Sequence, residues 1–316
     1  MSLGSSNDEA IRHEPVLLGD VLRVLDPRPG GLYVDCTLGG AGHAAAILEK
    51  AGEGARLIGL DRDAQALERS GKRLGAFGGR VELHCERFEN IGAVLAGRMP
   101  DGILMDLGVS SFMLDDPARG FSFRADGPLD MRMDRSQELT AATIVNTWSA
   151  EELATVFRTF GEERHAGRVA RRIVREREKE AIVTTLRLAD IVSSVVPKGK
   201  FRIHPATRVF MALRIAVNGE LDRLEEALLT AVDLLVPGGR LAVITFHSLE
   251  DRIVKQTFAR LAKGCVCPPR LPVCVCGKKA RVKPVTKKPV GPTDEETARN
   301  PRARSAFLRA VQKEAA

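Results

Sequence analysis

The residues best suited to chemistry are two acids and a glycine-rich stretch. Asp35 lies in a short apolar run, residues 32–36, and Gly40-Ala41-Gly42-His43 follows that run. Asp61 ends a second apolar run roughly twenty residues beyond the glycines, the distance at which an acid meets a ribose diol. Glycines in a strand-to-helix turn let the backbone approach a ligand. The pattern predicts a nucleoside-containing cofactor, although such residues also serve packing and helix capping.

Two cofactors fit this pattern, NAD(H) and S-adenosylmethionine. The pyrophosphate of NAD(H) favours backbone donors and the positive end of a helix, and a carboxylate at Asp35 would oppose it. S-adenosylmethionine has no phosphate and carries an ammonium and a sulfonium group, which a nearby acid stabilises. The pattern D-x-x-x-G-x-x-G from Asp35 to Gly42 therefore favours the methyl donor. An NAD-dependent oxidoreductase on a similar sheet is the alternative.

Both acids belong to a regular alternation of strands and helices. Short apolar runs predict strands at 32–36, 56–61, 80–85, 102–107, 241–246, 282–290 and 305–311. Helical patterns separate the early strands, which predicts a parallel sheet with right-handed crossovers. Ligands bind such sheets at the carboxyl ends of the strands, so both acids fall on the binding edge.

The alternation breaks after the fourth strand. Residues 115–136 form a loop rich in Gly, Pro, Asp and Met, and residues 141–196 are mostly helical in pattern, with a capping box at Ser149. We therefore predict an α/β fold in which an all-helical domain is inserted into a discontinuous sheet domain. The sheet domain takes residues 1–114 and 214–316, and the helical domain takes residues 115–213.

The composition limits the class of protein. The 316 residues are 44% hydrophobic and 28% charged, which excludes wholesale disorder. No apolar run is long enough for a membrane span, and the N-terminus lacks the apolar part of a secretory signal. A net charge of +7 permits a nucleic-acid partner. Residues 263–288 are basic and hold no acid, which fits either phosphate contact or a solvated tail.

The cysteines fall into two groups. Cys36 and Cys85 stand singly in apolar runs, as reduced core thiols do, which predicts a cytoplasmic protein. Cys265-Val-Cys267 and Cys274-Val-Cys276 form two close pairs. Four thiolates suffice for zinc, but the usual spacing is C-x-x-C, so we assign no metal ligand and leave a zinc site open. A disulfide is the less favoured alternative.

Longer stretches make the chain resemble the MraW/RsmH family, the bacterial 16S ribosomal RNA cytosine-N4 methyltransferases. These stretches run from the start of the chain to its end, and several are long and unusual. They include HEPVLL at His13, DCTLGGAGH at Asp35, GLDRDAQAL at Gly59, DGILMDLGVSS at Asp101, RGFSFRADGPLDMRMD at Arg119, GEERHAGRVARRIV at Gly161, HPATRVFMALRIAVNGEL at His204, PGGRLAVITFHSLEDRIVK at Pro237 and NPRARSAFLR at Asn300.

The resemblance implies a class I methyltransferase sheet, which is Rossmann-like, with S-adenosylmethionine as cofactor. It implies a decoding-centre cytidine of 16S rRNA, in the small ribosomal subunit, as target. Carried over one by one, the family's cofactor contacts fall on Ala41, Gly42, His43, Asp61, Phe88, Asp106 and Met113. The family usually has glycine at 41, proline at 112 and glutamine at 113. Ala41 and Met113 keep a rival open, a non-catalytic ribosome-assembly factor with a degenerate pocket.

Asp106 and His247 are the candidate catalytic residues. Asp106 ends the fourth strand, where a buried charge must be paired or functional. The N4 nitrogen of cytosine is a poor nucleophile, and an acceptor aimed at its hydrogens would orient its lone pair and stabilise the growing positive charge. His247 follows the fifth strand on the same edge, either as a later proton acceptor or as a structural residue. The oligomeric state stays open.

Overall fold

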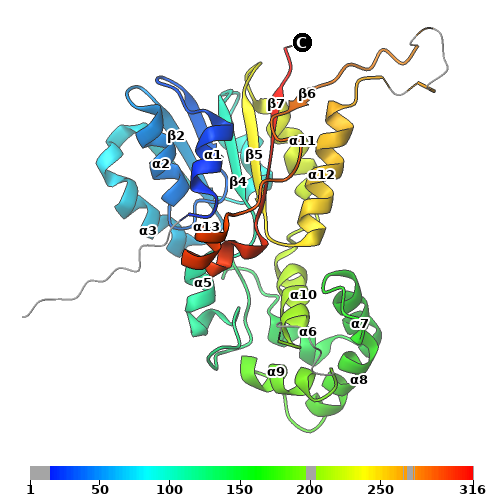
Figure 1. The fold of residues 1–316 in the computed structure, drawn as a ribbon. Coiled ribbons are helices and arrows are strands. Elements are labelled where there is room, and N and C mark those ends of the chain that lie inside the picture. Colours follow the sequence, from blue (N-terminus) through cyan, green and yellow to red (C-terminus); the bar gives the residue numbers. More distant parts are fainter. Residues whose placement is uncertain (1–14, 197–203, 266, 269–272, 274, 316) are drawn as a thin grey trace, which may run out of the picture.

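A computed structural model describes residues 15–196, 204–265, 267–268, 273 and 275–315 (Figure 1). One sheet has the strand order β3-β2-β1-β4-β5-β7-β6. Its strands are β1 (Leu32–Asp35), β2 (Arg56–Asp61), β3 (Val81–Cys85), β4 (Gly102–Asp106), β5 (Arg240–Thr245), β6 (Val282–Pro284) and β7 (Phe307–Lys313). Strands β1 to β5 are parallel, and β7 is antiparallel to β5 and β6. The predicted Rossmann-like α/β class is confirmed.

Helices cover both faces of the sheet because its central strands are apolar on both sides. In β4, Leu104 packs on one face, whereas Ile103 and Met105 pack on the other, as the two-residue period of a strand requires. The first face is covered by α1 (Leu18–Leu25), α2 (Gly42–Ala51) and the end of α3 (Ala64–Leu74). The second face is covered by α4 (Ile91–Leu95), α11 (Leu224–Leu234) and α12 (Ser248–Ala262).

The first of the two predicted C-terminal strands is shorter than its apolar pattern, whereas the second, predicted at 305–311, is found at Phe307–Lys313. The run predicted at 282–290 is a strand only as far as Pro284, and Val290 then makes an isolated bridge to Leu308. Proline lacks the backbone N–H that a ladder needs, so a strand at the sheet edge ends there readily. The short helix α13 (Asp294–Arg299) follows before β7.

The segment after β4 is a helical layer with its own apolar core. Its helices are α5 (Ser111–Asp115), α6 (Ala141–Thr147), α7 (Ala150–Thr159), α8 (Ala166–Arg177), α9 (Thr185–Ser193) and α10 (Thr207–Asn218). The predicted capping box forms, since Ser149 and Glu152 bond reciprocally at the start of α7. The core extends from Met113 to Val217, so α10 spans the predicted boundary at residue 213. Figure 1 shows this layer, in green, beyond one end of the sheet.

Among the described helices, none combines the length and the apolar character that a membrane crossing needs.

Candidate active site

Three acids gather where neighbouring parallel strands end, at what we call the carboxyl edge of the sheet. Asp35 ends β1, Asp61 ends β2 and Asp106 ends β4, and β1 lies between the other two strands. The side chain of Asp35 is buried, and its Oδ1 accepts a hydrogen bond from the Thr37 backbone N–H at 3.1 Å. Adjacency in the sheet therefore brings together acids that lie far apart in the sequence.

The glycine loop between β1 and α2 lies against this edge. Ala41 is the N-cap of α2 and has a left-handed backbone with φ 55°, a conformation that costs alanine about 1 kcal/mol relative to glycine. A Cβ on Gly40 would lie 2.8 Å from the ring of Phe112, so a larger residue there would displace that ring. The Arg69 guanidinium lies 4.7 Å from the centroid of the same ring. Phe112, where proline is usual in the family, thus covers the loop.

Asp61 is fixed in orientation by two backbone donors. Its Oδ2 accepts from the Gly39 N–H at 2.8 Å, and its Oδ1 accepts from the Asp63 N–H at 2.8 Å. Each oxygen keeps a second lone pair, because a carboxylate oxygen accepts more than one hydrogen bond. Burial raises the pKa of Asp61, although these two donors lower it. The carboxylate is thus held beside the glycine loop with acceptor capacity left over.

Asp106 lies next to His43, although the sequence analysis had not paired these two residues. The Asp106 Oδ2 lies 3.7 Å from the His43 Nδ1, and the His43 Nε2 lies 2.9 Å from the Val16 carbonyl. The Asp106 backbone N–H donates to the Thr37 Oγ1 at 2.6 Å. The Asp106 side chain is 24% exposed, yet its Oδ1 is buried and has no hydrogen-bond partner among the described residues. A buried acceptor without a donor marks a place where a donor can bind.

The carboxyl edge holds protons near neutral pH. The pKa of Asp35 is raised to about 7, mainly by burial and also by the charge of Asp61, although hydrogen bonds from Thr37 oppose the shift. Burial raises the pKa of Asp106 well above its ordinary value, and the carboxylates of Asp35 and Glu250 add to the shift. Neighbouring acids in a desolvated site disfavour each other's ionisation, and a bound cation reverses this effect.

A charged cluster that the sequence analysis missed lies beside this edge. The Arg214 Nε and Nη2 donate to the two carboxylate oxygens of Glu220, each at 2.9 Å. Glu250 is buried, and its Oε2 accepts from the Phe246 N–H at 2.9 Å. Burial raises the pKa of Glu250, but His247 and Arg214 outweigh burial, and the net shift is downward. The signal was a lone Arg in the apolar run MALRIAV.

His247 is engaged in the first turn of α12. Its Nδ1 accepts from the Glu250 N–H at 3.4 Å as the helix N-cap, and its Nε2 lies 3.1 Å from the Glu250 Oε1. The imidazole is thus fixed through its Nδ1 at the end of β5, whereas its buried Nε2 has no hydrogen-bond partner among the described residues. This geometry fits the structural alternative for His247.

Phe88 and Met113 pack in apolar clusters. Phe88 begins the turn after β3 and packs, partly exposed, against the core beneath α4 and α11. Met113 is 4% exposed and lies in the core of the helical layer. The structure thus brings the glycine loop, Asp61 and Asp106 together. The side chains of Phe88 and Met113 are instead held mainly by the core of the sheet domain and the core of the helical layer, respectively.

A loop of the helical layer is tied to the carboxyl edge by one buried arginine. The Arg119 Nη1 donates to the Asp63 Oδ2 at 2.9 Å, and its Nη2 donates to the Met133 carbonyl at 2.9 Å. The Asn218 Oδ1 accepts a hydrogen bond from the Met133 N–H at 2.8 Å, so the last residue of α10 also holds this loop. Asp63 stands two residues after Asp61, so the loop and the edge are fixed together.

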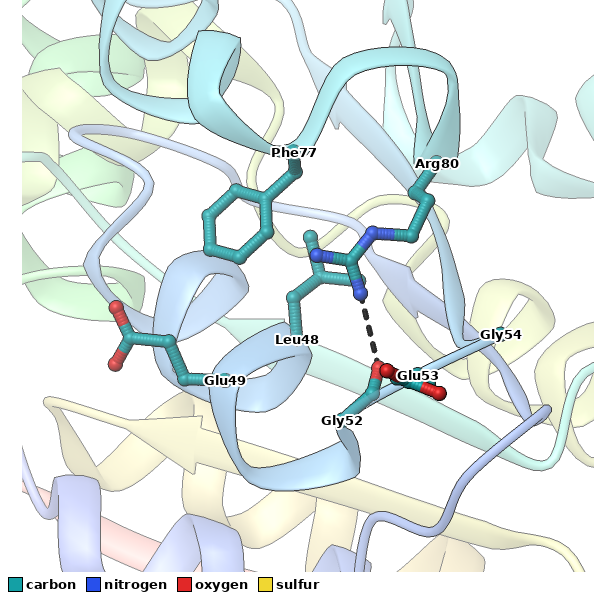
Figure 2. A pocket seen from close by; sticks show the side chains of 7 residues that line it. All are labelled: Leu48, Glu49, Gly52, Glu53, Gly54, Phe77 and Arg80. Atoms are coloured by element: carbon teal, nitrogen blue, oxygen red, sulfur yellow. Dashed lines mark hydrogen bonds between the residues drawn. The ribbon is translucent and has the colours of Figure 1, made fainter.

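Two surface hollows lie at opposite ends of the sheet. Figure 2 shows the first, where the Arg80 Nη1 donates to the Gly52 carbonyl at 2.9 Å beside the Phe77 ring. It lies at the amino ends of β2 and β3, far from the three acids. The second lies at the carboxyl end of β5 and is lined by Phe246, His247, Ser248, Asp251, Arg252, Lys255, Ser305 and Phe307.

The chain is similar to known methyltransferases over nearly its whole length. Residues 10–314 match the MraW methylase family. Ribosomal RNA small subunit methyltransferase H of Symbiobacterium thermophilum is 56% identical over 310 residues, which covers 96% of this chain and 97% of the relative. The enzyme of the same name from Syntrophotalea carbinolica is 53% identical over 310 residues, which covers 96% of this chain and 99% of the relative.

Proposed function

Since the chain belongs to the MraW methylase family of S-adenosylmethionine-dependent methyltransferases, we propose that it methylates the exocyclic N4 of a decoding-centre cytidine. The proposed substrate is 16S rRNA within the small ribosomal subunit, and the proposed setting is the cytoplasm. The observation that carries this proposal is Asp106, whose buried Oδ1 lacks a donor among the described residues at the carboxyl edge. Family membership removes the NAD-dependent alternative.

The residues at the edge fit the cofactor. The backbone of Ala41, Gly42 and His43 is the proposed cradle for its methionine part, which needs the close approach that this loop allows. Asp61 is the proposed acceptor for the ribose hydroxyls, and the acids beside it suit an ammonium and a sulfonium group. We assign the adenine to the partly exposed ring of Phe88, and the carried-over contact at Met113 involves a side chain that the core of the helical layer leaves only 4% exposed. When bound, S-adenosylmethionine supplies an activated methyl group.

Asp106 is the proposed catalytic residue. Its Oδ1 accepts a hydrogen bond from the N4 of cytosine, which turns the nitrogen lone pair away from conjugation with the ring and stabilises the positive charge that develops there. The N4 proton becomes acidic only as this charge appears. Burial raises the pKa of Asp106, which makes its carboxylate the stronger base, and the positive charge of the bound cofactor favours the ionised form that can accept that proton.

The helical layer is the proposed substrate-recognition domain, with the predicted limits 115–213. A base that reacts must leave its stack, which costs a few kcal/mol and needs a surface that holds the displaced strand.

The hollow at the end of β5 carries the basic side chains of Arg252 and Lys255 and the 43% exposed residue Phe307. These groups suit phosphate contact and base stacking beside the carboxyl edge.

Replacing Asp61 tests the cofactor assignment. Asp61→Ala removes the acceptors for both ribose hydroxyls, and hydrogen bonds to a charged group each contribute about 1.5–3 kcal/mol. We expect the affinity for S-adenosylmethionine in calorimetry to fall at least about tenfold. Glu68→Ala, on the exposed face of α3, is the matched control and should bind normally. Unchanged affinity in Asp61→Ala would place the ribose elsewhere.

Cofactor affinity should depend on pH through Asp35. Below about pH 7 its carboxyl is protonated and neutral, so it no longer attracts a cation; above that pH it is ionised. We therefore expect the affinity for S-adenosylmethionine to fall as the pH is lowered from about 8 to about 6, by at most about tenfold per unit for one group, with proton release on binding near neutrality. Calorimetry in buffers of different ionisation enthalpy measures both. Asp35→Asn should flatten the profile, and an equally steep profile in that variant would contradict the assignment.

The basic segment after α12 should supply phosphate contacts. Lys279, Lys287 and Lys288 are exposed on it. Replacing all three by Gln should weaken binding to small-subunit RNA and reduce the slope of log affinity against log salt by about one for each phosphate that a lysine no longer neutralises. The exposed Lys50 and Arg56, near the amino end of β2, are the control pair. A salt slope that stays unchanged in the triple variant would contradict binding through this segment.

One experiment tests the whole proposal. The protein is incubated with labelled S-adenosylmethionine and with small ribosomal subunits from a strain that lacks the corresponding activity, and the digested RNA is analysed by mass spectrometry. We expect label in N4-methylcytidine. Label in another nucleoside would overturn the assignment to N4, and subunit binding without label would support the non-catalytic assembly factor.

A further inference from the structure

The segment that joins α12 to β6 brings together three thiols that the proposed methyl transfer does not use. Cys265 and Cys267 follow the end of α12, and Cys276 lies shortly before β6. The Sγ atoms of all three lie within 4.8 Å of one another. Residues from two separate stretches therefore converge on one point, at the surface of the sheet domain rather than in its core.

One pair of sulfur atoms has the separation expected in a metal site, and the third sulfur lies within 4.8 Å of both. The Cys276 Sγ lies 3.8 Å from the Cys265 Sγ. Ligands at a zinc–sulfur distance of about 2.3 Å in a tetrahedron stand about 3.8 Å apart, which matches this separation. A disulfide needs about 2.05 Å between the two sulfurs, so this pair is not in disulfide geometry.

The backbone around the thiols is arranged to hold them. The Cys267 N–H donates to the Cys265 Sγ at 3.3 Å, a bond that stabilises a thiolate. A Cβ on Gly264 would lie 3.5 Å from the Ala280 backbone nitrogen, so the two stretches approach closely. The Arg281 N–H donates to the Leu261 carbonyl at 2.9 Å and fixes the base of the segment to the last turn of α12.

We propose that Cys265, Cys267 and Cys276 bind one structural Zn²⁺ ion that fixes the segment between α12 and β6. Zinc is the expected metal because it favours thiolates and tetrahedral geometry. The ion carries no part of the methyl-transfer chemistry, so this inference does not rest on the proposed function. The sequence offers Cys274 as a candidate fourth ligand, and that residue lies outside the described part of the chain.

Metal analysis of the full-length protein tests the site. The chain is purified under reducing conditions from zinc-supplemented cells, and metals are measured by mass spectrometry. We expect one zinc per chain, and Co²⁺ exchanged for it should show thiolate-to-cobalt charge transfer and the visible bands of tetrahedral cobalt. Bound iron instead of zinc, an intramolecular disulfide found by mass spectrometry, or the absence of both metal and cobalt bands would each overturn the proposal.

Serine variants separate the site from general effects of losing a thiol. Cys267→Ser and Cys276→Ser should each lose most of the zinc, while circular dichroism and S-adenosylmethionine affinity stay as in the parent, because the site lies outside the three apolar cores. Cys85 is exposed at the end of β3, so its prediction as a core thiol is wrong, and Cys85→Ser is the matched control that should keep its zinc. Cys274→Ser asks whether the fourth ligand is a thiolate. Full zinc content in both Cys267→Ser and Cys276→Ser would overturn the proposal.

Discussion

Asp106→Asn should lower the rate of methyl transfer by about a hundredfold or more while RNA affinity stays within about twofold. The substitution keeps the size of the side chain but removes its charge, so it can neither stabilise the cation at N4 nor accept the N4 proton. The Asp106 carboxylate ends β4, and its buried Oδ1 has no hydrogen-bond partner among the described residues, which is why the effect should fall on this side chain. Single-turnover rates at saturating S-adenosylmethionine measure it.

Two further measurements separate an effect of Asp106→Asn on the chemical step from effects on cofactor binding or on the fold. Asp106 also stands 3.7 Å from His43 in the glycine loop, so the affinity of Asp106→Asn for S-adenosylmethionine must be measured alongside its rate. His247→Ala, which removes the N-cap of α12, should reduce the rate less and the stability more. If Asp106→Asn transfers methyl at nearly the parent rate, backbone carbonyls at the end of β4 become the better acceptors.

Local patterns were enough to predict the strands and the acids that end them. The apolar runs around Asp35, Asp61 and Asp106 are short, buried on both faces and separated by helices. This alternation is enough to predict parallel strands at those positions. The carboxyl ends of parallel strands lie on the same edge of a sheet, so the three acids can be expected there together before any distance is known. The glycine loop is predictable for the same reason, since it follows the first strand directly.

Contacts between distant segments could not be predicted in the same way. Arg214 interrupts an apolar run, which marks it as unusual, but the sequence does not show that Glu220 is its partner or that both side chains are desolvated. Phe112 covers Gly40 because the start of the helical layer folds back over the loop. The cysteine spacing argued against a metal, whereas the path of the chain brings three thiols together. Each case depends on a tertiary contact that no local pattern encodes.

Arg214→Met should reduce the free energy of unfolding by about 3 kcal/mol, the largest stability effect that we expect from one charged side chain here. The Arg214 and Glu220 side chains are only 15% and 5% exposed, and they share two hydrogen bonds of 2.9 Å. Removing the arginine leaves a buried carboxylate without its cation, and it also takes a positive charge away from Glu250. Urea unfolding monitored by circular dichroism measures the change.

A second Arg–Glu ion pair, exposed on the surface, provides the matched control. Arg223 donates through Nε and Nη2 to Glu226 at 3.0 and 2.9 Å, yet its side chain is 54% exposed, so water and salt screen the interaction. Arg223→Met should therefore leave the urea midpoint within error. The double variant Arg214→Met with Glu220→Gln should recover more than half of the loss, because no buried charge is left unpaired. If Arg214→Met and Arg223→Met proved equally mild, the cluster beside the carboxyl edge would not be desolvated, and the downward pKa shift of Glu250 would need another cause.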